Sequence, residues 1–314
     1  MSAASRLLQI SALARCFASG TGITNVSFTV PPGSITGFIG VNGAGKSTTL
    51  RCVMGLLRPD AGEILLFGAP ANRAARNRIG FLPEERGLFA HERAREAIAF
   101  HGRLKGMRRR DAFSAADRLL ERIGLGARKR DRLGSLSKGN AQRVQVLCAL
   151  VHEPQLLLLD EPLSGLDPVA QADMLSLLAE FRGRGGAVLF STHSMTAAEQ
   201  VCDRVVMLAG GRTVFEGTMP DAAALSPHGA EVVTADGQGL AIAAESIGGY
   251  VIPLAAGMGE AGRWRVVLPR QVTHPVLVRA LAEQGVPIFN FQPIQANLES
   301  AFWQLAKPAE SRAA

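Results

Sequence analysis

The stretch "GVNGAGKST" occupies residues 40–48, directly after the short apolar run "SITGFIG" at 34–40. Behind it, apolar residues repeat at spacings of three and four, which predicts a helix over 46–57. A strand, a glycine-rich loop and a helix in this order are typical of a phosphate-binding loop. The backbone N–H groups of such a loop curl around phosphate oxygens, and the helix N-terminus adds positive potential.

Two side chains of this loop carry chemistry of their own. Lys46 reaches the outer phosphates, and Ser47 offers its hydroxyl to Mg²⁺. The spacing G-x-x-x-x-G-K-S arises by chance in only about one chain in a hundred of this composition. We therefore expect the phosphates to lie against the loop and the first helical residues, namely Gly40, Asn42, Gly43, Ala44, Gly45, Lys46, Ser47 and Thr48.

A second polar pair follows the apolar run in "PQLLLLDEP" (154–162). Four leucines in a row are typical of a parallel strand that is buried on both faces. Asp160 at its end can bind Mg²⁺ through water, and Glu161 can orient and deprotonate an attacking water. An acid pair in this position is more often a strand end or a helix cap. The phosphate-binding loop upstream favours catalysis.

The segment "LSKGN" (136–140) predicts another anion-binding helix start. Ser137 can cap the helix and offer its hydroxyl, and Gly139 lets the backbone approach a phosphate closely. The chain therefore carries two helix starts that suit a phosphate, far apart in sequence.

Taken together, these motifs resemble the ATP-binding cassette (ABC) ATPases over roughly residues 6–218. The signature sequence of that family matches "LSKGN", with Ser137, Gly139 and Asn140 as nucleotide contacts. Its aspartate loop matches "SGLD", with Ser164 and Asp167, and its switch histidine matches His193 in "STHS". All stand in the family's order. A lone histidine after a strand is more often structural or on the surface.

The resemblance implies ATP and Mg²⁺ as cofactors and ATP hydrolysis as the activity. Lys46, Glu161 and His193 would be the catalytic residues, with His193 sensing the γ-phosphate. It also implies head-to-tail dimers, in which the signature of one subunit closes over the nucleotide held by its neighbour. This arrangement explains why one chain carries two helix N-termini that suit a phosphate. The second subunit would be another copy of this chain or a relative, and we favour the copy.

Four positions depart from the family pattern, and one of them is Asn140, where the signature commonly has glutamine. The aromatic residue that stacks on adenine falls at Phe17, where tyrosine is usual, and packing in the core is the alternative. Glu84 in "FLPEERGLF" replaces the usual glutamine, so we expect the metal to be held by Ser47, Glu84 and Asp160. Lys138 replaces a glycine of the signature. It could add charge near the shared nucleotide, although a side chain pointing into solvent is favoured.

The predicted fold class is α/β. We expect a P-loop NTPase core of the ABC type over residues 1–221, with a mostly parallel sheet flanked by helices and an antiparallel β subdomain. Arginine-rich sequence over about 91–133 predicts a helical insertion. Residues 222–314 predict a smaller C-terminal α+β domain without a motif that we can interpret.

Composition adds bounds. The 314 residues are 47% hydrophobic and carry a net charge of +7, which suits phosphates, nucleic acid or anionic membrane. Four scattered cysteines predict reduced thiols. We expect no signal peptide, because polar residues break the first apolar stretch. No apolar run reaches the length of about 18 residues that a membrane-spanning helix needs.

The resemblance also implies a partner. Transport members dock a separate membrane permease beside the helical insertion, here in a groove from Gly87 to Leu104 that includes Leu88, Phe89 and Phe100. In the residues of its motifs and in its C-terminal extension, the chain looks most like bacterial sodium- and drug-efflux ATPases. We therefore expect an exporter subunit, peripheral on the cytoplasmic side of the inner (plasma) membrane.

The alternative is a soluble ABC ATPase that acts on ribosomes or nucleic acid. The net charge of +7 and the arginine-rich segment 103–132 would then mark the nucleic-acid-binding surface. Translation-type members carry two cassettes and repair-type members a long coiled coil, and this chain has neither. We therefore expect no nucleic-acid partner. Intact Lys46, Asp160, Glu161 and His193 also disfavour an inactive scaffold.

Overall fold

The computed structural model describes residues 6–84, 90–226, 228–255, 261–294 and 297–306. The chain forms two compact units, Met1–Met219 (unit 1) and Pro220–Ala314 (unit 2). Each has its own buried apolar cluster.

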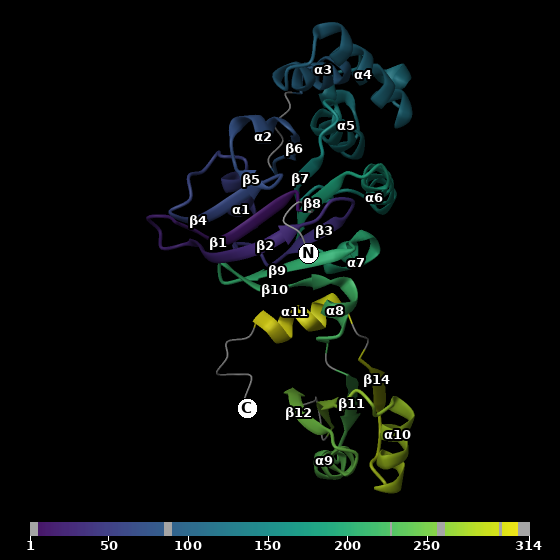
Figure 1. Cartoon of the computed structure of the whole chain (residues 1–314). Helices are drawn as coiled ribbons and strands as arrows, with labels where there is room; N and C mark the ends of the chain where they lie inside the picture. The colour runs from purple at the N-terminus through teal and green to yellow at the C-terminus, as the bar shows by residue number, and fades with distance from the viewer. Residues whose placement is uncertain (1–5, 85–89, 227, 256–260, 295–296, 307–314) are drawn as a thin grey trace. The chain divides into compact units, whose positions relative to one another are not determined.

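Unit 1 is built around a ten-stranded mixed sheet with the order β5-β4-β1-β2-β10-β9-β3-β8-β7-β6 (Figure 1). Within the group β9, β3, β8, β7 and β6, every neighbouring pair is parallel. The pairs β1–β2, β1–β4 and β4–β5 are antiparallel. The strands are β1 (Leu8–Cys16), β2 (Gly22–Val30), β3 (Ile35–Ile39), β4 (Ala61–Leu66), β5 (Ala69–Pro70), β6 (Ile79–Leu82), β7 (Leu156–Asp160), β8 (Ala187–Thr192), β9 (Arg204–Ala209) and β10 (Arg212–Thr218).

Helices connect the parallel strands. They are α1 (Lys46–Val53), α2 (Arg73–Asn77), α3 (Ala94–Leu104), α4 (Arg109–Arg122), α5 (Lys138–Leu150), α6 (Pro168–Gly183) and α7 (Met195–Val201), with two 3₁₀ turns at Gly126–Arg128 and Leu133–Ser135. The helix expected over 46–57 ends earlier, at Val53. Gly55 has φ +72°, so the chain leaves the helical conformation there.

The central strands are buried on both faces, which is why they read as unbroken apolar runs. Every residue of β3, β7 and β8 is buried. Along β8, Val188 joins the cluster with the helical insertion, whereas Leu189 joins the cluster with β1 and β2. The parallel strands are therefore fixed from both sides, and their carboxyl ends lie at a well-defined edge.

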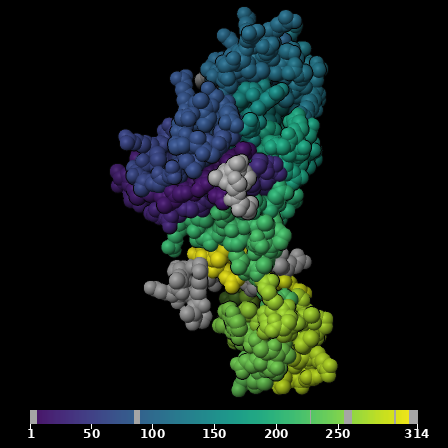
Figure 2. Space-filling view, in the orientation of Figure 1, coloured from purple at the N-terminus to yellow at the C-terminus, as the bar shows by residue number. Residues whose placement is uncertain are grey.

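The helices α3 and α4 form a lobe at the top of unit 1 (Figures 1 and 2). Small residues on both helices, such as Ala97 and Ala116, are buried and allow close packing. Arg95 joins the helices through two hydrogen bonds of 2.7 Å to the Asp117 carboxylate. The arginines of this region thus include structural ones.

Unit 2 contains a four-stranded antiparallel sheet with the order β12-β13-β11-β14. Its apolar cluster includes Leu240 of α9 and Leu277 of α10 together with Val232 and Val266 of the sheet. The elements are α8 (Met219–Ala223), β11 (Gly229–Thr234), α9 (Gly237–Ser246), β12 (Tyr250–Ala255), β13 (Gly262–Val267), α10 (His274–Glu283), β14 (Asn290–Pro293) and α11 (Leu298–Ala306).

A search of the described residues finds no helix with the length and apolar character needed to span a membrane. The four cysteines, all within these residues, are free thiols.

Candidate active site

The glycine-rich loop lies between β3 and α1, at the carboxyl edge of the sheet. Gly45 precedes α1 with φ +102°, and a Cβ there would collide with Ile23 of β2. A Cβ on Gly40 would lie 2.7 Å from the carbonyl oxygen of Leu208. Both positions therefore require glycine for steric reasons, and the loop backbone remains free to face a phosphate.

Lys46 is buried within this loop, with 6% of its side chain exposed. Its Nζ donates to the carbonyl oxygens of Gly40 at 2.6 Å and Val41 at 3.4 Å. It also lies 3.7 Å from Glu161 Oε1. Burial lowers the pKa of Lys46, while the nearby carboxylates of Glu161, Asp160 and Glu84 act in the opposite direction. The Lys46 ammonium is thus held beside the loop by two carbonyl oxygens and the Glu161 carboxylate. The oxygens of a phosphate could replace these partners.

The two acids after β7 have different surroundings. Asp160 is 2% exposed and accepts a hydrogen bond of 2.5 Å from the Ser191 hydroxyl. Ser191 also accepts one of 3.0 Å from the backbone N–H of Glu161. Our sequence prediction missed Ser191. A polar residue at the end of the apolar strand "AVLFST" is the signal that could have found it.

Glu161 adopts a left-handed backbone with φ +49°, which is uncommon for a residue other than glycine. Its carboxylate lies between two of the expected catalytic groups. Oε2 is 3.0 Å from His193 Nδ1, and Oε1 faces the Lys46 ammonium. The three residues predicted to be catalytic therefore meet at one point, although they come from three separate segments.

The expected metal ligands are oxygen donors around the same point. Ser47 follows Lys46 in α1, and the charges of Asp160 and Glu84 both act on Lys46. Hard oxygen donors suit Mg²⁺, which is commonly bound by one or two carboxylates together with substrate phosphates. In the described ranges, no three acidic, histidine or cysteine side chains form a metal-binding group by themselves. The donor set thus fits an ion that is shared with a nucleotide.

The signature lies at the start of α5, far in sequence from the phosphate-binding loop at 40–48. Ser137 caps α5 by accepting a hydrogen bond of 3.3 Å from the N–H of Asn140. Asp167 caps α6 in the same way, from the N–H of Ala170 at 3.0 Å. For the described part of the chain, no hydrogen bond or ion pair joins Ser137, Gly139, Asn140, Ser164 or Asp167 to the loop at 40–48.

Phe17 follows β1 and is 36% exposed, with the Arg15 guanidinium 5.6 Å from its ring centre. By contrast, Phe28 and Phe38 are buried and stack at 5.0 Å in the core. Phe17 is thus the accessible ring of the three, and its contact with adenine stays a prediction.

The groove expected for a permease lies only partly within the described residues. Gly87, Leu88 and Phe89 lie outside them. On α3, Phe100 is 50% exposed and Leu104 is 65% exposed. These two side chains and Arg103 line a shallow hollow with Gly106, Met107 and Arg109.

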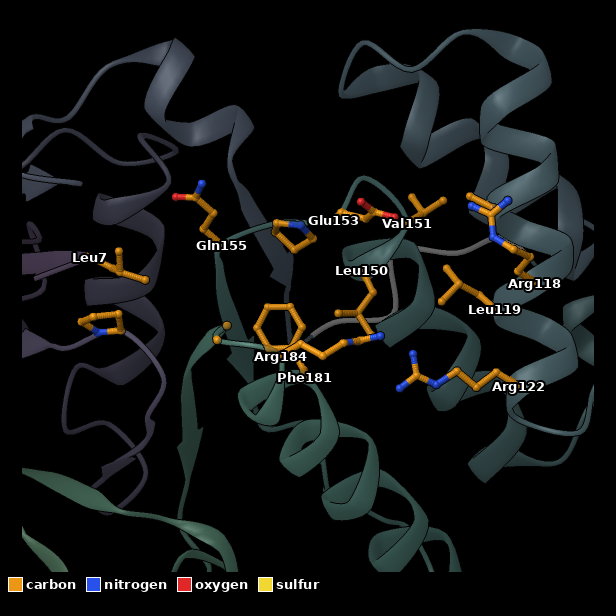
Figure 3. A pocket seen from close by; sticks show the side chains of 15 residues that line it. Leu7, Arg118, Leu119, Arg122, Leu150, Val151, Glu153, Gln155, Phe181 and Arg184 are labelled. Atoms are coloured by element: carbon orange, nitrogen blue, oxygen red, sulfur yellow. The ribbon is translucent and has the colours of Figure 1, made fainter. Parts of the chain in front are cut away.

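A cavity of about 810 Å³ separates the helical lobe from the sheet core. Leu119 and Arg122 of α4 face Phe181 and Arg184 at the end of α6 across it (Figure 3). None of the predicted site residues lines this cavity. The cavity therefore lies apart from the predicted site.

The family model described as "ABC transporter" matches residues 23–164. An uncharacterised ABC transporter ATP-binding protein of Bacillus subtilis, YhaQ, is 36% identical over 68% of this chain and 72% of its own length. The chain belongs to the ABC transporter ATP-binding family. The predicted family and the predicted α/β fold class are thereby confirmed.

Two further proteins are similar to the chain. Nod factor export ATP-binding protein I of Burkholderia lata is 39% identical over 67% of this chain and 70% of its own length. A solved ATP-binding subunit of an ABC transporter is 31% identical, with a TM-score of 0.63, and covers 69% of this chain and 92% of that one. The shared region is the size of unit 1.

Proposed function

We propose that this ABC protein is the ATP-hydrolysing subunit of an exporter, and that closure of two copies around ATP drives substrate through a separate membrane permease. One observation carries the proposal. Lys46, Glu161 and His193 meet at one point, whereas among the described residues no hydrogen bond or ion pair joins Ser137, Gly139 or Asn140 to the loop at 40–48. A second copy would supply the missing signature.

In the proposed reaction, the γ-phosphate binds against the loop backbone and Lys46. Glu161 accepts a proton from the attacking water, and His193 holds the Glu161 carboxylate in place. Mg²⁺, held by Ser47, Asp160 and Glu84 when bound, would offset charge on the phosphates. Hydrolysis then removes the phosphate that joins the two copies, and the copies separate.

Mixing two variants tests the shared site. Lys46→Ala spoils the loop and Ser137→Arg blocks the signature, so each homodimer lacks intact sites. A mixed dimer contains one intact site, so a 1:1 mixture should recover up to about a quarter of wild-type turnover. Specific activity of the wild type should also rise with protein concentration.

Ser135→Arg, at an exposed position just before the signature, is the matched control and should turn over normally. No recovery in the mixture, together with wild-type activity that is independent of concentration, would refute the shared site.

The exposed apolar residues of α3 support a permease partner, because such a patch marks an interaction surface. We propose that Phe100 and Leu104 belong to it, with the chain peripheral on the cytoplasmic side of the membrane. The export direction is proposed from the Nod factor export relatives. We further propose the nucleotide-binding domain as 1–221 and an accessory domain as 222–314, since the compact units divide after Met219.

Phe100→Asp should abolish co-purification with the permease from detergent extract while the isolated chain hydrolyses ATP at an unchanged rate. Arg110→Asp, on the neighbouring helix, is the control for an added acid. Retained co-purification in Phe100→Asp would remove this residue from the docking surface. Release of the wild type from ribosomes or DNA by salt would instead support the nucleic-acid alternative.

A further inference from the structure

The start of α5 is fastened to the segment that contains the aspartate loop of the same chain. Gln142 donates to the carbonyl oxygen of Pro162 at 3.3 Å. Arg143 forms an ion pair of 3.3 Å with Asp173 of α6. These contacts join the signature helix to the residues just before the aspartate loop and to α6, which follows it.

Gly139 and Ala170 show how closely the two segments approach. A Cβ added to Gly139 would lie 2.9 Å from the Cβ of Ala170, so only glycine allows this contact without displacement. The backbone of the signature therefore rests directly on the first turn of α6. A change in the angle of one helix N-terminus would therefore displace the other.

Lys138 adds a contact between the middle of the signature and the middle of the aspartate loop. Its Nζ occupies the space that a Cβ on Gly165 would need, and its Cε would lie 2.8 Å from such a Cβ. Gly165 has φ +65°, a conformation that glycine adopts at little cost. The lysine is exposed, yet its ammonium lies against the loop rather than extending away from the protein.

The loop around Gly165 needs such support. Ser164, Gly165 and Asp167 are exposed, and loops of this kind are mobile unless side chains restrain them. Two backbone hydrogen bonds close the turn, from Ser164 N to Glu161 O at 3.1 Å and from Leu166 N to Leu163 O at 3.3 Å. The first of them connects the loop directly to the residue proposed as the general base.

We propose that Lys138 is a positioning residue for the reaction: its ammonium, seated on Gly165, holds the aspartate loop to the signature. The two segments then meet the triphosphate and loop of a second copy as one preformed surface. This inference rests on the proposed function, because it concerns the surface that completes a neighbour's site. Preforming that surface lowers the entropy that closure costs.

Hydrogen exchange of the full-length chain without nucleotide tests the restraint directly. Lys138→Met keeps the aliphatic stem and removes the ammonium, so the amides of Ser164 and Leu166 should exchange about fivefold faster. Lys138→Arg keeps a cation and should retain most of the protection. Arg110→Met is the control for loss of an exposed charge. Unchanged exchange at both amides in Lys138→Met would overturn the proposal.

Turnover provides the second readout. Lys138→Met should leave ATP affinity of the dilute, monomeric chain unchanged and lower turnover about fivefold at low protein concentration, with recovery at high concentration. Gly165→Ala should displace the lysine, so adding Lys138→Met to it should cause little further loss. Additive losses would show that the lysine acts elsewhere and would overturn the proposal.

The two proposals fail in different ways. If wild-type activity does not depend on protein concentration, the shared site is refuted, while exchange at Ser164 and Leu166 still reports on Lys138. If activity depends on concentration but Lys138→Met behaves like wild type in exchange and turnover, only the role of Lys138 is refuted.

Discussion

Glu161 has a left-handed backbone, and both its peptide N–H and its carboxylate form hydrogen bonds. Its N–H donates to Ser191 Oγ at 3.0 Å, and its carboxylate lies 3.0 Å from His193. A residue held in a sparsely populated conformation by its surroundings is characteristic of active sites. Here the conformation turns the carboxylate away from the line of β7 and toward Lys46.

Glu161→Gln should keep ATP affinity and lower turnover by about a hundredfold or more, because the amide cannot accept the proton from water. ATP-bound dimers should accumulate, which gel filtration with ATP would detect. The control is Glu63→Gln, at an exposed position of β4. Normal turnover in Glu161→Gln would exclude it as the general base.

Residues in motifs were predictable because motif spacing fixes their chemistry locally. Lys46 and Glu161 could be predicted for that reason and His193 through the family resemblance, and the structure brings the three together. Ser191 was not predicted, since a polar residue at the end of an apolar strand does not by itself show that its side chain binds an acid such as Asp160. The seat of Lys138 on Gly165 depends on the packing of α5 against α6, which no local pattern encodes.

At the scale of elements, the carbonyl of Ile79 joins the lobe to the sheet. Lys105 at the end of α3 donates to the carbonyl oxygens of Ile79 and Arg76, each at 3.0 Å. His152, just after α5, lies 3.2 Å from the same Ile79 oxygen through Nε2, which must donate as N–H. Burial, with help from the Lys105 charge, lowers the pKa of His152 to about 4.

This junction predicts a pH dependence of stability. The unfolded histidine has a pKa of 6.5, so the unfolded state binds more protons between pH 6.5 and about 4. The contribution of His152 to the free energy of unfolding should be constant above pH 6.5 and fall as the pH drops through that window, by about 3 kcal/mol at most. Urea unfolding at pH 7.5 and 5 measures the change.

In His152→Gln, which keeps an N–H donor, the fall between pH 7.5 and 5 should be smaller by that contribution. Equal falls in the two proteins would show that His152 is not the titrating group.

Elements with strong local signals form where the sequence predicted them. The strand before the loop at 40–48, the leucine strand at 156–160 and the helix after "LSKGN" all form. The end of α1 was wrong by four residues, because apolar spacing continued past the turn at Gly55. The Ile79 junction joins residues that are 26 and 73 positions apart, and its existence could not be inferred from periodicity.

At the scale of the whole molecule, the chain has separate apolar clusters in its two units. The alternation of strands and helices predicted the sheet of unit 1. The strand order of unit 2 could not be predicted. In that unit β11 pairs with β13 and β14, which follow it only after other elements, and such long-range pairing leaves no local signal.

Separate cores predict separate unfolding transitions. Calorimetry of the full chain should resolve two, and ATP with Mg²⁺ should raise only the one that belongs to unit 1, because a ligand stabilises the state it binds. At a concentration of about 100 times Kd the shift corresponds to about 2.7 kcal/mol. The Glu161→Gln variant avoids turnover during the scan. A single transition that shifts as a whole would contradict independent units.

Ile23 of β2 lies directly against Gly45 of the phosphate-binding loop. Ile23 lies near the start of β2, and Phe17 lies in the short turn that joins β1 to β2. One hairpin therefore lies against the phosphate-binding loop and also carries Phe17, the ring that we propose to contact adenine, so its length would set the distance between the two contacts. Adding a residue between 18 and 21 would move the ring outward and leave the floor beneath the phosphates where it is.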